Sequence, residues 1–309
     1  MDDYQQAAAG LRCWQGLPEH TEVTFFHDHL TDASTLVERL RPFDAVVAMR
    51  ERTPFPAAVL ERLPALRLLI TTGMSNAAID LDAARLLGIT VCGTRLRPHP
   101  AAELTWALIL ELAKRTGRQD TGLRAGAWQS GVGLDLDGAT LGVVGLGKLG
   151  RKVAAIGAAF GMDVVAWSQN LTAEHGASAG VEVVSKEELF RRSDYVTIHL
   201  RYSERTRSVV GEAELGLMKP TAFLVNTSRA PIVDQAALLA ALHGGRIGGA
   251  GLDVHPVEPV PASDPVLRAP HTVLTPHIGY VTRGNFELSY SDAAECVSAF
   301  LSDRPVRVL

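Results

Sequence analysis

The chain has 309 residues, of which 47% are hydrophobic and 21% are charged, and its formal net charge is −4. This length predicts two domains, and the scattered lysines and arginines exclude the basic surface that binds nucleic acid or an anionic membrane. The cysteines, Cys13, Cys92 and Cys296, form no disulfide or Cys-x-x-Cys pattern, which indicates buried thiols in the reducing cytoplasm. No metal site, signal peptide or transmembrane segment is expected.

Short apolar strands alternate with helices over roughly the first 95 residues, a pattern typical of a parallel α/β layer. Asp32 or Ser34 is a suitable N-cap for the first of these helices. The predicted strands are Glu22–His27, Asp44–Met49, Leu66–Thr71 and Ile89–Cys92, and the predicted helices are Asp32–Leu40, Pro56–Leu63 and Leu81–Leu87.

A long apolar helix, Ala101–Thr116, follows the connecting segment Thr94–Pro100, and the glycine-rich stretch Gly117–Gly138 is predicted to be irregular. Strands and helices then alternate again from Thr140 on, which predicts a doubly wound parallel sheet. A last helix, Arg283–Leu301, is expected to return to the first domain. The strands predicted for this sheet are Leu141–Gly145, Asp163–Ala166, Tyr195–His199, Ala222–Asn226, Gly249–Asp253 and Thr272–Thr275, and the helices are Lys148–Phe160, Lys186–Arg192, Gly211–Met218 and Asp234–His243.

A glycine-rich turn directly follows the first strand of this sheet and opens a helix. Its sequence is Gly145-Leu146-Gly147-Lys148-Leu149-Gly150, a Gly-x-Gly-x-x-Gly motif in the strand–turn–helix context that gives the motif its meaning. Gly145 permits the tight turn, Gly147 lets a pyrophosphate approach the backbone, and Gly150 lets helix and strand pack closely. The motif predicts dinucleotide binding at the start of the helix.

The second strand of this sheet ends in Ser168-Gln169-Asn170, where an acidic residue would grip the ribose hydroxyls of NAD. The turn contains neither a carboxylate to repel a 2′-phosphate nor an arginine or lysine to attract one. These polar side chains can hydrogen-bond either form, so the cofactor is expected to be NAD or NADP.

Three residues that follow later strands have the chemistry of a reaction site. Arg229 follows one strand and can grip a carboxylate in a fork, with a solvated loop arginine as the alternative. Glu258 and His277 follow two others, and a carboxylate that accepts the ring proton would let the imidazole deliver a proton near neutral pH. His255 and His271 are competing histidines, but neither directly follows the last residue of a strand.

At these residues the chain resembles the D-isomer-specific 2-hydroxyacid dehydrogenase family. The resemblance covers essentially the whole chain, and its motifs match in order and spacing. The helix containing Ala102-Glu103-Leu104 is similar to the family's interdomain helix. The matching stretches are Gly145-Leu146-Gly147-Lys148-Leu149-Gly150, Val225-Asn226-Thr227-Ser228-Arg229, Gly251-Leu252-Asp253-Val254, Val257-Glu258-Pro259 and Thr275-Pro276-His277-Ile278-Gly279.

The resemblance implies a fold and a set of roles. A Rossmann-type doubly wound parallel sheet domain, residues 99–282, would be inserted into a smaller flavodoxin-like α/β substrate domain, residues 1–98 and 283–309. Arg229 would bind the substrate carboxylate and keto oxygen, and His277, oriented by Glu258, would protonate the developing alkoxide. Asp253 would contact the nicotinamide carboxamide. The other implied cofactor contacts are Gly145, Gly147, Lys148, Leu149, Gly150, Ser168, Gln169, His199, Thr206, Thr227, Ser228 and Gly279.

The chain departs from the family where the substrate carboxylate usually meets a Gly-x-Gly loop of the first domain. Here the loop reads Thr72-Gly73-Met74-Ser75-Asn76, so Met74, Ser75 and Asn76 become the expected substrate contacts, Asn76 through a side-chain hydrogen bond. Arg50 and Arg52 follow the preceding strand. An inward-pointing arginine would favour a phosphorylated or dicarboxylic substrate, and a solvated turn is the alternative.

The predicted function is hydride transfer between a nicotinamide cofactor and a small 2-keto or D-2-hydroxy acid of the glyoxylate, hydroxypyruvate or 3-phosphohydroxypyruvate class. Formate dehydrogenase is one alternative, but that family has Gln where this chain has Glu258. A cofactor-sensing corepressor is another, although such proteins extend well past the last helix and this sequence stops at Leu309. The resemblance also suggests a homodimer formed through the cofactor domain.

Overall fold

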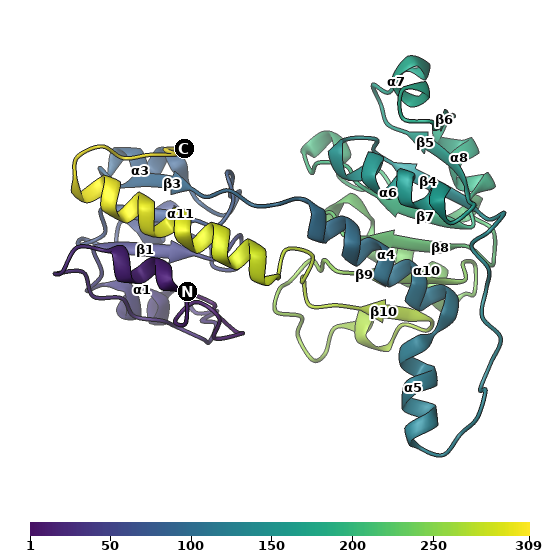
Figure 1. Cartoon of the computed structure of the whole chain (residues 1–309), viewed down its shortest axis with the longest axis horizontal. Coiled ribbons are helices and arrows are strands. Elements are labelled where there is room, and N and C mark those ends of the chain that lie inside the picture. Colours follow the sequence, from purple (N-terminus) through teal and green to yellow (C-terminus); the bar gives the residue numbers. More distant parts are fainter. The chain divides into compact units, whose positions relative to one another are not determined.

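A computed structural model describes residues 1–309 and divides them into two compact units. Unit 1 combines Met1–Arg97 with Val281–Leu309, and unit 2 is the continuous stretch Pro98–Tyr280. These boundaries lie within two residues of those that the sequence predicts. Figure 1 colours both units along the chain, with the start and the end of the sequence in unit 1.

Unit 1 contains a parallel three-stranded sheet in the order β1-β2-β3. Side chains of its strands alternate between two apolar clusters. Leu69 and Val91 face three short helices, whereas Leu68, Ile70 and Cys92 face the long carboxyl-terminal helix. The elements are α1 (Ala33–Leu40), β1 (Ala45–Ala48), α2 (Ala57–Leu60), β2 (Leu68–Thr71), α3 (Leu81–Leu86), β3 (Thr90–Gly93) and α11 (Arg283–Leu301), with a 3₁₀ turn, η1, at Arg12–Gly16.

The predicted first strand, Glu22–His27, is wrong, because this segment joins no sheet. The first residues of the chain lie between it and β1: the Met1 amine donates to the Val47 carbonyl at 3.1 Å and the Asp3 N–H donates to the Phe26 carbonyl at 3.0 Å. A cavity of about 120 Å³, lined largely by apolar side chains, lies beside these residues and β1.

Unit 2 contains a parallel seven-stranded sheet in the order β10-β9-β8-β7-β4-β5-β6. Helices α4 and α6 pack on one face, and α8, α9 and α10 supply the apolar cluster on the other. Its strands are β4 (Thr140–Val144), β5 (Asp163–Trp167), β6 (Glu182–Val183), β7 (Tyr195–Ile198), β8 (Phe223–Asn226), β9 (Gly249–Leu252) and β10 (Thr272–Leu274). Its helices are α4 (His99–Lys114), α5 (Thr116–Arg124), α6 (Lys148–Ala159), α7 (Ala173–Ala177), α8 (Lys186–Arg192), α9 (Glu212–Leu217) and α10 (Gln235–His243).

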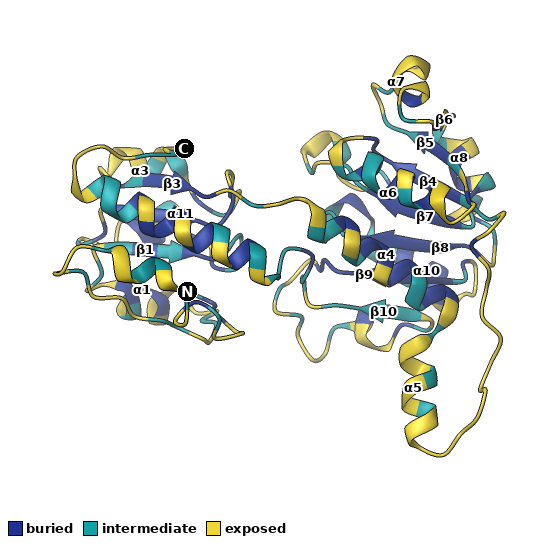
Figure 2. Ribbon diagram, viewed as in Figure 1, coloured by how far each residue is buried: buried dark blue, intermediate teal, exposed yellow.

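The stretch predicted to be irregular, Gly117–Gly138, instead begins within helix α5. The carboxylate of Glu111 caps this helix, because it accepts hydrogen bonds from the Thr116 hydroxyl and the Gly117 N–H. Figure 2 shows α5 as largely exposed, and none of its residues is buried. The short elements β6 and α7 were also not predicted. No helix in either unit has both the length and the apolar character needed to cross a membrane.

The predicted close packing of the glycine turn against β4 is present in unit 2. A Cβ atom added to Gly150 would collide with the Gly145 carbonyl oxygen and would lie 3.2 Å from Val143 Cγ1. Gly145 itself has a φ of +102°, which favours glycine. Both positions therefore require glycine for steric reasons.

We expect Gly150→Ala to destabilise unit 2 by about 1–3 kcal/mol, because the added methyl group forces α6 away from β4. Gly216→Ala is the matched control, since a Cβ at this α9 position meets no atom within 4 Å. Removal of a helical glycine there should stabilise the protein by about 0.4–1 kcal/mol. Urea unfolding followed by circular dichroism measures both free energies, and an unchanged midpoint for Gly150→Ala would contradict the packing argument.

Candidate active site

Residues after the strands of unit 2 gather at one edge of its sheet. Because all seven strands are parallel, their carboxyl ends share this edge. Gly145 follows β4, His199 follows β7, Thr227 follows β8, Asp253 follows β9 and Thr275 follows β10. From β4 the chain adds β5 and β6 on one side of the sheet and then β7, β8, β9 and β10 on the other. The boundary between β4 and β7 is therefore the topological switch point, where doubly wound sheets bind ligands.

The glycine turn leaves room for a phosphate group at the start of α6. Gly147 is the N-cap of α6 and no side chain caps the helix, while a Cβ at this position would meet no atom within 4 Å. Lys148 and Leu149 are the first two residues of the helix. Backbone N–H groups at such a helix start bind anions. The residues present therefore fit the pyrophosphate of a dinucleotide.

His199 supports the glycine turn from the next strand of the sheet. Its N–H donates to the Val144 carbonyl at 2.8 Å, and its Nε2 hydrogen-bonds the Thr197 hydroxyl at 3.0 Å. Burial lowers the pKa of His199 to about 4, so the ring is neutral at physiological pH. Thr206 lies in the 3₁₀ turn η2 (Glu204–Thr206), where its hydroxyl donates to the Arg201 carbonyl at 2.9 Å.

The loop after β8 is tied to its neighbours on both sides. The Thr227 hydroxyl is 2.8 Å from the Thr105 hydroxyl on α4, and the Ser228 hydroxyl donates to the Leu200 carbonyl at 2.9 Å. The sequence does not predict the contact with Thr105, because 122 positions separate it from Thr227. These two contacts fix the backbone directly before Arg229.

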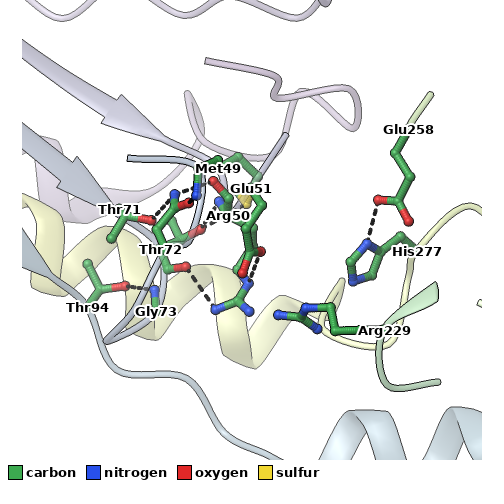
Figure 3. Close-up of polar contacts among 12 residues, drawn as sticks. Met49, Arg50, Glu51, Thr71, Thr72, Gly73, Thr94, Arg229, Glu258 and His277 are labelled. Atoms are coloured by element: carbon green, nitrogen blue, oxygen red, sulfur yellow. Dashed lines mark hydrogen bonds and ion pairs between the residues drawn. The ribbon is translucent and has the colours of Figure 1, made fainter. Parts of the chain in front are cut away.

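Arg229 begins the 3₁₀ turn η3 (Ala230–Ile232). The side-chain amide of Asn226 donates to the Arg229 carbonyl at 3.1 Å, and one guanidinium nitrogen donates to the Ser228 carbonyl at 2.8 Å. Figure 3 shows the Arg229 and His277 side chains extending in the same direction from the loops that carry them.

His277 and Glu258 form the hydrogen-bonded pair that the sequence predicts. His277 Nδ1 lies 2.6 Å from Glu258 Oε2, and their side chains are 18% and 27% exposed. Burial raises the pKa of Glu258, but the hydrogen bond and charge of His277 outweigh it and hold that pKa below 4.5. Glu258 also accepts from the His255 N–H at 2.9 Å. The competing His255 is buried and its ring hydrogen-bonds the Thr275 carbonyl at 3.0 Å, so it supports the loop.

Asp253 holds the segment that carries His277. Its carboxylate accepts hydrogen bonds from the Thr275 hydroxyl, the Ile278 N–H and the Gly279 N–H at 2.7, 2.7 and 2.9 Å. Burial is the largest influence on this group and raises its pKa. His277 has a φ of +54°, an unusual backbone conformation for a residue with a Cβ, and the donors bound by Asp253 come from Thr275, two residues before it, and from the two residues after it. The contact predicted between Asp253 and a nicotinamide carboxamide stays a prediction.

In unit 1, Arg50 lies over the turn that follows β2. One guanidinium nitrogen donates to the Thr72 carbonyl at 3.3 Å, and another is 3.4 Å from the Glu51 carboxylate (Figure 3). A Cβ on Gly73 would collide with this guanidinium, and the Gly73 N–H donates to the Thr94 hydroxyl at 3.0 Å. The loop therefore has glycine at the point where the arginine crosses it.

Two polar residues of unit 1 that were considered as substrate contacts have partners within the protein. Both donors of the Asn76 amide are used within the protein, at the Arg50 carbonyl and the Thr71 hydroxyl, and its donation to a substrate stays a prediction. Arg52 donates to the Asp2 carbonyl at 2.6 Å, which gives it a structural partner. Met74 and Ser75 are exposed on the same loop and stay predictions.

After β5, the half-buried Ser168 and the exposed Gln169 and Asn170 occupy a turn closed by the Leu171 N–H and the Ser168 carbonyl. The turn itself contains no cation, but Arg205, from η2, donates to Gln169 Oε1 at 3.1 Å. Nothing in the local sequence signals this contact between segments 36 positions apart. No group of His, Cys, Asp and Glu side chains in the chain is arranged to hold a metal ion.

Comparison with known proteins decides the family. Residues 106–279 match the family model described as D-isomer specific 2-hydroxyacid dehydrogenase, NAD binding domain. The chain belongs to the D-isomer-specific 2-hydroxyacid dehydrogenase family. This match confirms both the family resemblance of the motifs and the predicted Rossmann-type parallel α/β fold. Unit 2 is therefore the nicotinamide-cofactor domain of this dehydrogenase.

Relatives of this dehydrogenase have several names. It is 38% identical to a glyoxylate reductase of Aeropyrum pernix, over 86% of this chain and 82% of the relative. It is 34% identical to D-3-phosphoglycerate dehydrogenase of Mycobacterium leprae, over 88% of this chain but only 52% of that longer protein. The crystal structure of a phosphoglycerate oxidoreductase from Vibrio cholerae matches with a TM-score of 0.93 and 36% identity, over 98% of each chain.

The lowered pKa of Glu258 predicts how acid affects this dehydrogenase. A carboxyl whose folded pKa is below its unfolded value stabilises the fold above the unfolded pKa, and that contribution disappears as the pH falls through the folded pKa. We expect Glu258→Gln to lower the free energy of unfolding by about 1 kcal/mol near pH 6. This difference from the wild type should shrink as the pH falls below 4.5.

Urea unfolding at a series of pH values measures this difference. Glu19→Gln, at an exposed turn position, is the control and should follow the wild type at every pH. A Glu258→Gln penalty that stays constant across the acid range would contradict an interaction between the two charges.

Proposed function

We propose that this dehydrogenase interconverts small 2-keto acids and D-2-hydroxy acids with a nicotinamide cofactor. The observation that carries the proposal is the His277–Glu258 hydrogen bond at 2.6 Å, at the sheet edge that also holds the open glycine turn. The family and its relatives named glyoxylate reductase and D-3-phosphoglycerate dehydrogenase support the same reaction class.

A bound nicotinamide cofactor supplies the hydride in the direction of reduction. His277 Nε2 delivers the proton that the developing alkoxide needs, while Nδ1 remains hydrogen-bonded to Glu258. The carboxylate of Glu258 fixes the ring orientation and stabilises the imidazolium. Arg229 binds the substrate carboxylate and polarises the keto oxygen.

We propose glyoxylate or hydroxypyruvate as the preferred substrate over 3-phosphohydroxypyruvate. A phosphorylated tail needs a cation whose charge is not already balanced. Arg50 lies 3.4 Å from the Glu51 carboxylate, and Arg52 lies with its guanidinium over the Tyr4 ring and donates to the Asp2 carbonyl. Since both arginines already have partners in unit 1, a substrate with a short uncharged tail fits better.

The formate dehydrogenase alternative is less well supported. Formate oxidation transfers a hydride without a proton shuttle, so a carboxylate hydrogen-bonded to His277 would have no task there. The corepressor alternative differs in turnover rather than in fold. It predicts tight cofactor binding without reduction of any 2-keto acid.

A steady-state assay with glyoxylate, hydroxypyruvate and 3-phosphohydroxypyruvate, each with NADH and NADPH, tests the proposal. We expect His277→Gln to lower kcat by roughly 10²–10⁴-fold while cofactor affinity stays near the wild-type value, because only the proton donor is lost. His243→Gln, at an exposed position of α10, should retain full activity. Undiminished turnover by His277→Gln would show that another group protonates the substrate.

We also propose that two copies associate through unit 2. Helix α5 and the segment after it are largely exposed (Figure 2). Apolar side chains contribute to this exposed surface, with Trp128 77% and Val132 89% exposed and Leu123 and Leu134 nearby in the sequence. A concentration of exposed apolar residues in one segment is typical of a protein interface. A second copy of the chain is the occupant we propose, in a symmetric pair.

Light scattering coupled to size-exclusion chromatography tests this association. We expect a dimer for the wild type and a monomer for the double variant Trp128→Ser, Val132→Ser, which removes apolar area from the interface. Leu86→Ser is the control, because Leu86 is 88% exposed on α3 of unit 1. A monomeric wild type, or a double variant that remains dimeric, would contradict the proposal.

A further inference from the structure

Arg205 is a cation that the proposed reaction does not use. It lies in η2, the short turn that follows β7, and its guanidinium donates to Gln169 Oε1 at 3.1 Å. Gln169 belongs to the turn after β5, the strand next to β4 on the side away from β7. In doubly wound dinucleotide-binding sheets, this position meets the adenosine ribose.

The backbone around Arg205 is held in place. The Ser203 N–H donates to the Thr206 hydroxyl at 2.8 Å, and that hydroxyl donates to the Arg201 carbonyl at 2.9 Å. The Ser203 and Thr206 side chains thus form a capping box around η2. The turn therefore presents Arg205 from a defined position next to the end of β5.

The positive charge of Arg205 is not balanced by an ion pair. No carboxylate of the chain lies within 4.0 Å of its guanidinium, and its hydrogen-bond partner Gln169 is neutral. The adjacent Glu204 is directed to Arg207 instead, with two hydrogen bonds of 3.0 and 2.9 Å. The hydrogen bonds and charge of Arg207 lower the pKa of Glu204, so its charge is matched there.

The turn after β5 also lacks the group that selects NAD. A carboxylate at this point would accept the ribose hydroxyls and repel a 2′-phosphate, but Ser168, Gln169 and Asn170 are all neutral. A guanidinium provides a planar fork of donors that matches a phosphate, and hydroxyl and amide groups add further donors. The local charge therefore favours a dianion over a neutral diol.

We propose that Arg205, together with Gln169 and Ser168, binds the 2′-phosphate of NADP(H) and makes this dehydrogenase prefer that cofactor. The proposal rests on the proposed function, since it assigns the cofactor of the same reaction. Arg205 determines specificity at the adenosine end and takes no part in hydride or proton transfer.

Direct binding measurements test the proposal without turnover. Isothermal titration calorimetry of the full chain with NADP⁺ and NAD⁺, and with the fragments 2′,5′-ADP and 5′-AMP, isolates the 2′-phosphate. We expect the wild type to bind the phosphorylated member of each pair roughly 10-fold or more tightly. Arg205→Gln should weaken NADP⁺ and 2′,5′-ADP by roughly 10- to 100-fold and leave NAD⁺ and 5′-AMP unchanged.

Two further variants complete the experiment. Arg191→Gln removes the same charge at an exposed position of α8 and should leave all four affinities unchanged. Gln169→Asp should reverse the preference, because a carboxylate in the turn accepts the ribose diol and repels the phosphate. Equal or tighter wild-type binding of NAD⁺, or an Arg205→Gln variant that weakens both cofactors equally, would overturn the assignment. If the wild type binds neither NAD⁺ nor NADP⁺, the proposed function is overturned as well.

Discussion

The carboxylate of Asp253 is the contact on which the geometry of the candidate active site depends. It lies at the end of β9 with 1% of its surface exposed, and it binds three donors from the segment Thr275–Gly279. Burial of a carboxylate without hydrogen-bond partners is energetically unfavourable, so these three hydrogen bonds keep the segment next to Asp253. His277 lies inside that segment, and its ring is hydrogen-bonded to Glu258 at 2.6 Å. A buried carboxylate thus fixes the backbone around His277, the residue that we propose as the proton donor.

Parallel strands make the rest of the arrangement possible. The glycine turn, His199, Arg229 and Asp253 come from four separate strands, yet they share an edge because all the strands run in one direction. Each side chain is then fixed by a local hydrogen bond: His199 to Thr197, Arg229 to the Ser228 carbonyl. The sheet supplies the common location and the short contacts supply the orientation, so neither alone accounts for the site.

The sequence predicts those parts of the molecule whose cause is local. The strand–turn–helix around Gly145 follows from backbone conformation, and most other helices and strands follow from apolar spacing and caps such as Asp32, whose side chain accepts from the Thr35 N–H. The contacts that the sequence does not predict join residues that are far apart in the chain. Asn76 uses its amide donors on Arg50 and Thr71, and the Arg205–Gln169 contact joins separate loops. Such partners meet only in the folded chain, so no local sequence pattern predicts them.

The division of unit 1 into two distant segments has a consequence for synthesis on the ribosome. Unit 2 is continuous, so it can fold as soon as its own residues have emerged. The sheet of unit 1 is made earlier, but Leu68, Ile70 and Cys92 are covered by Ala293 and Cys296 of α11, which is translated only after the whole of unit 2. This apolar surface therefore stays uncovered while unit 2 is translated, and nascent chains of this dehydrogenase are prone to aggregate at that face until α11 has emerged.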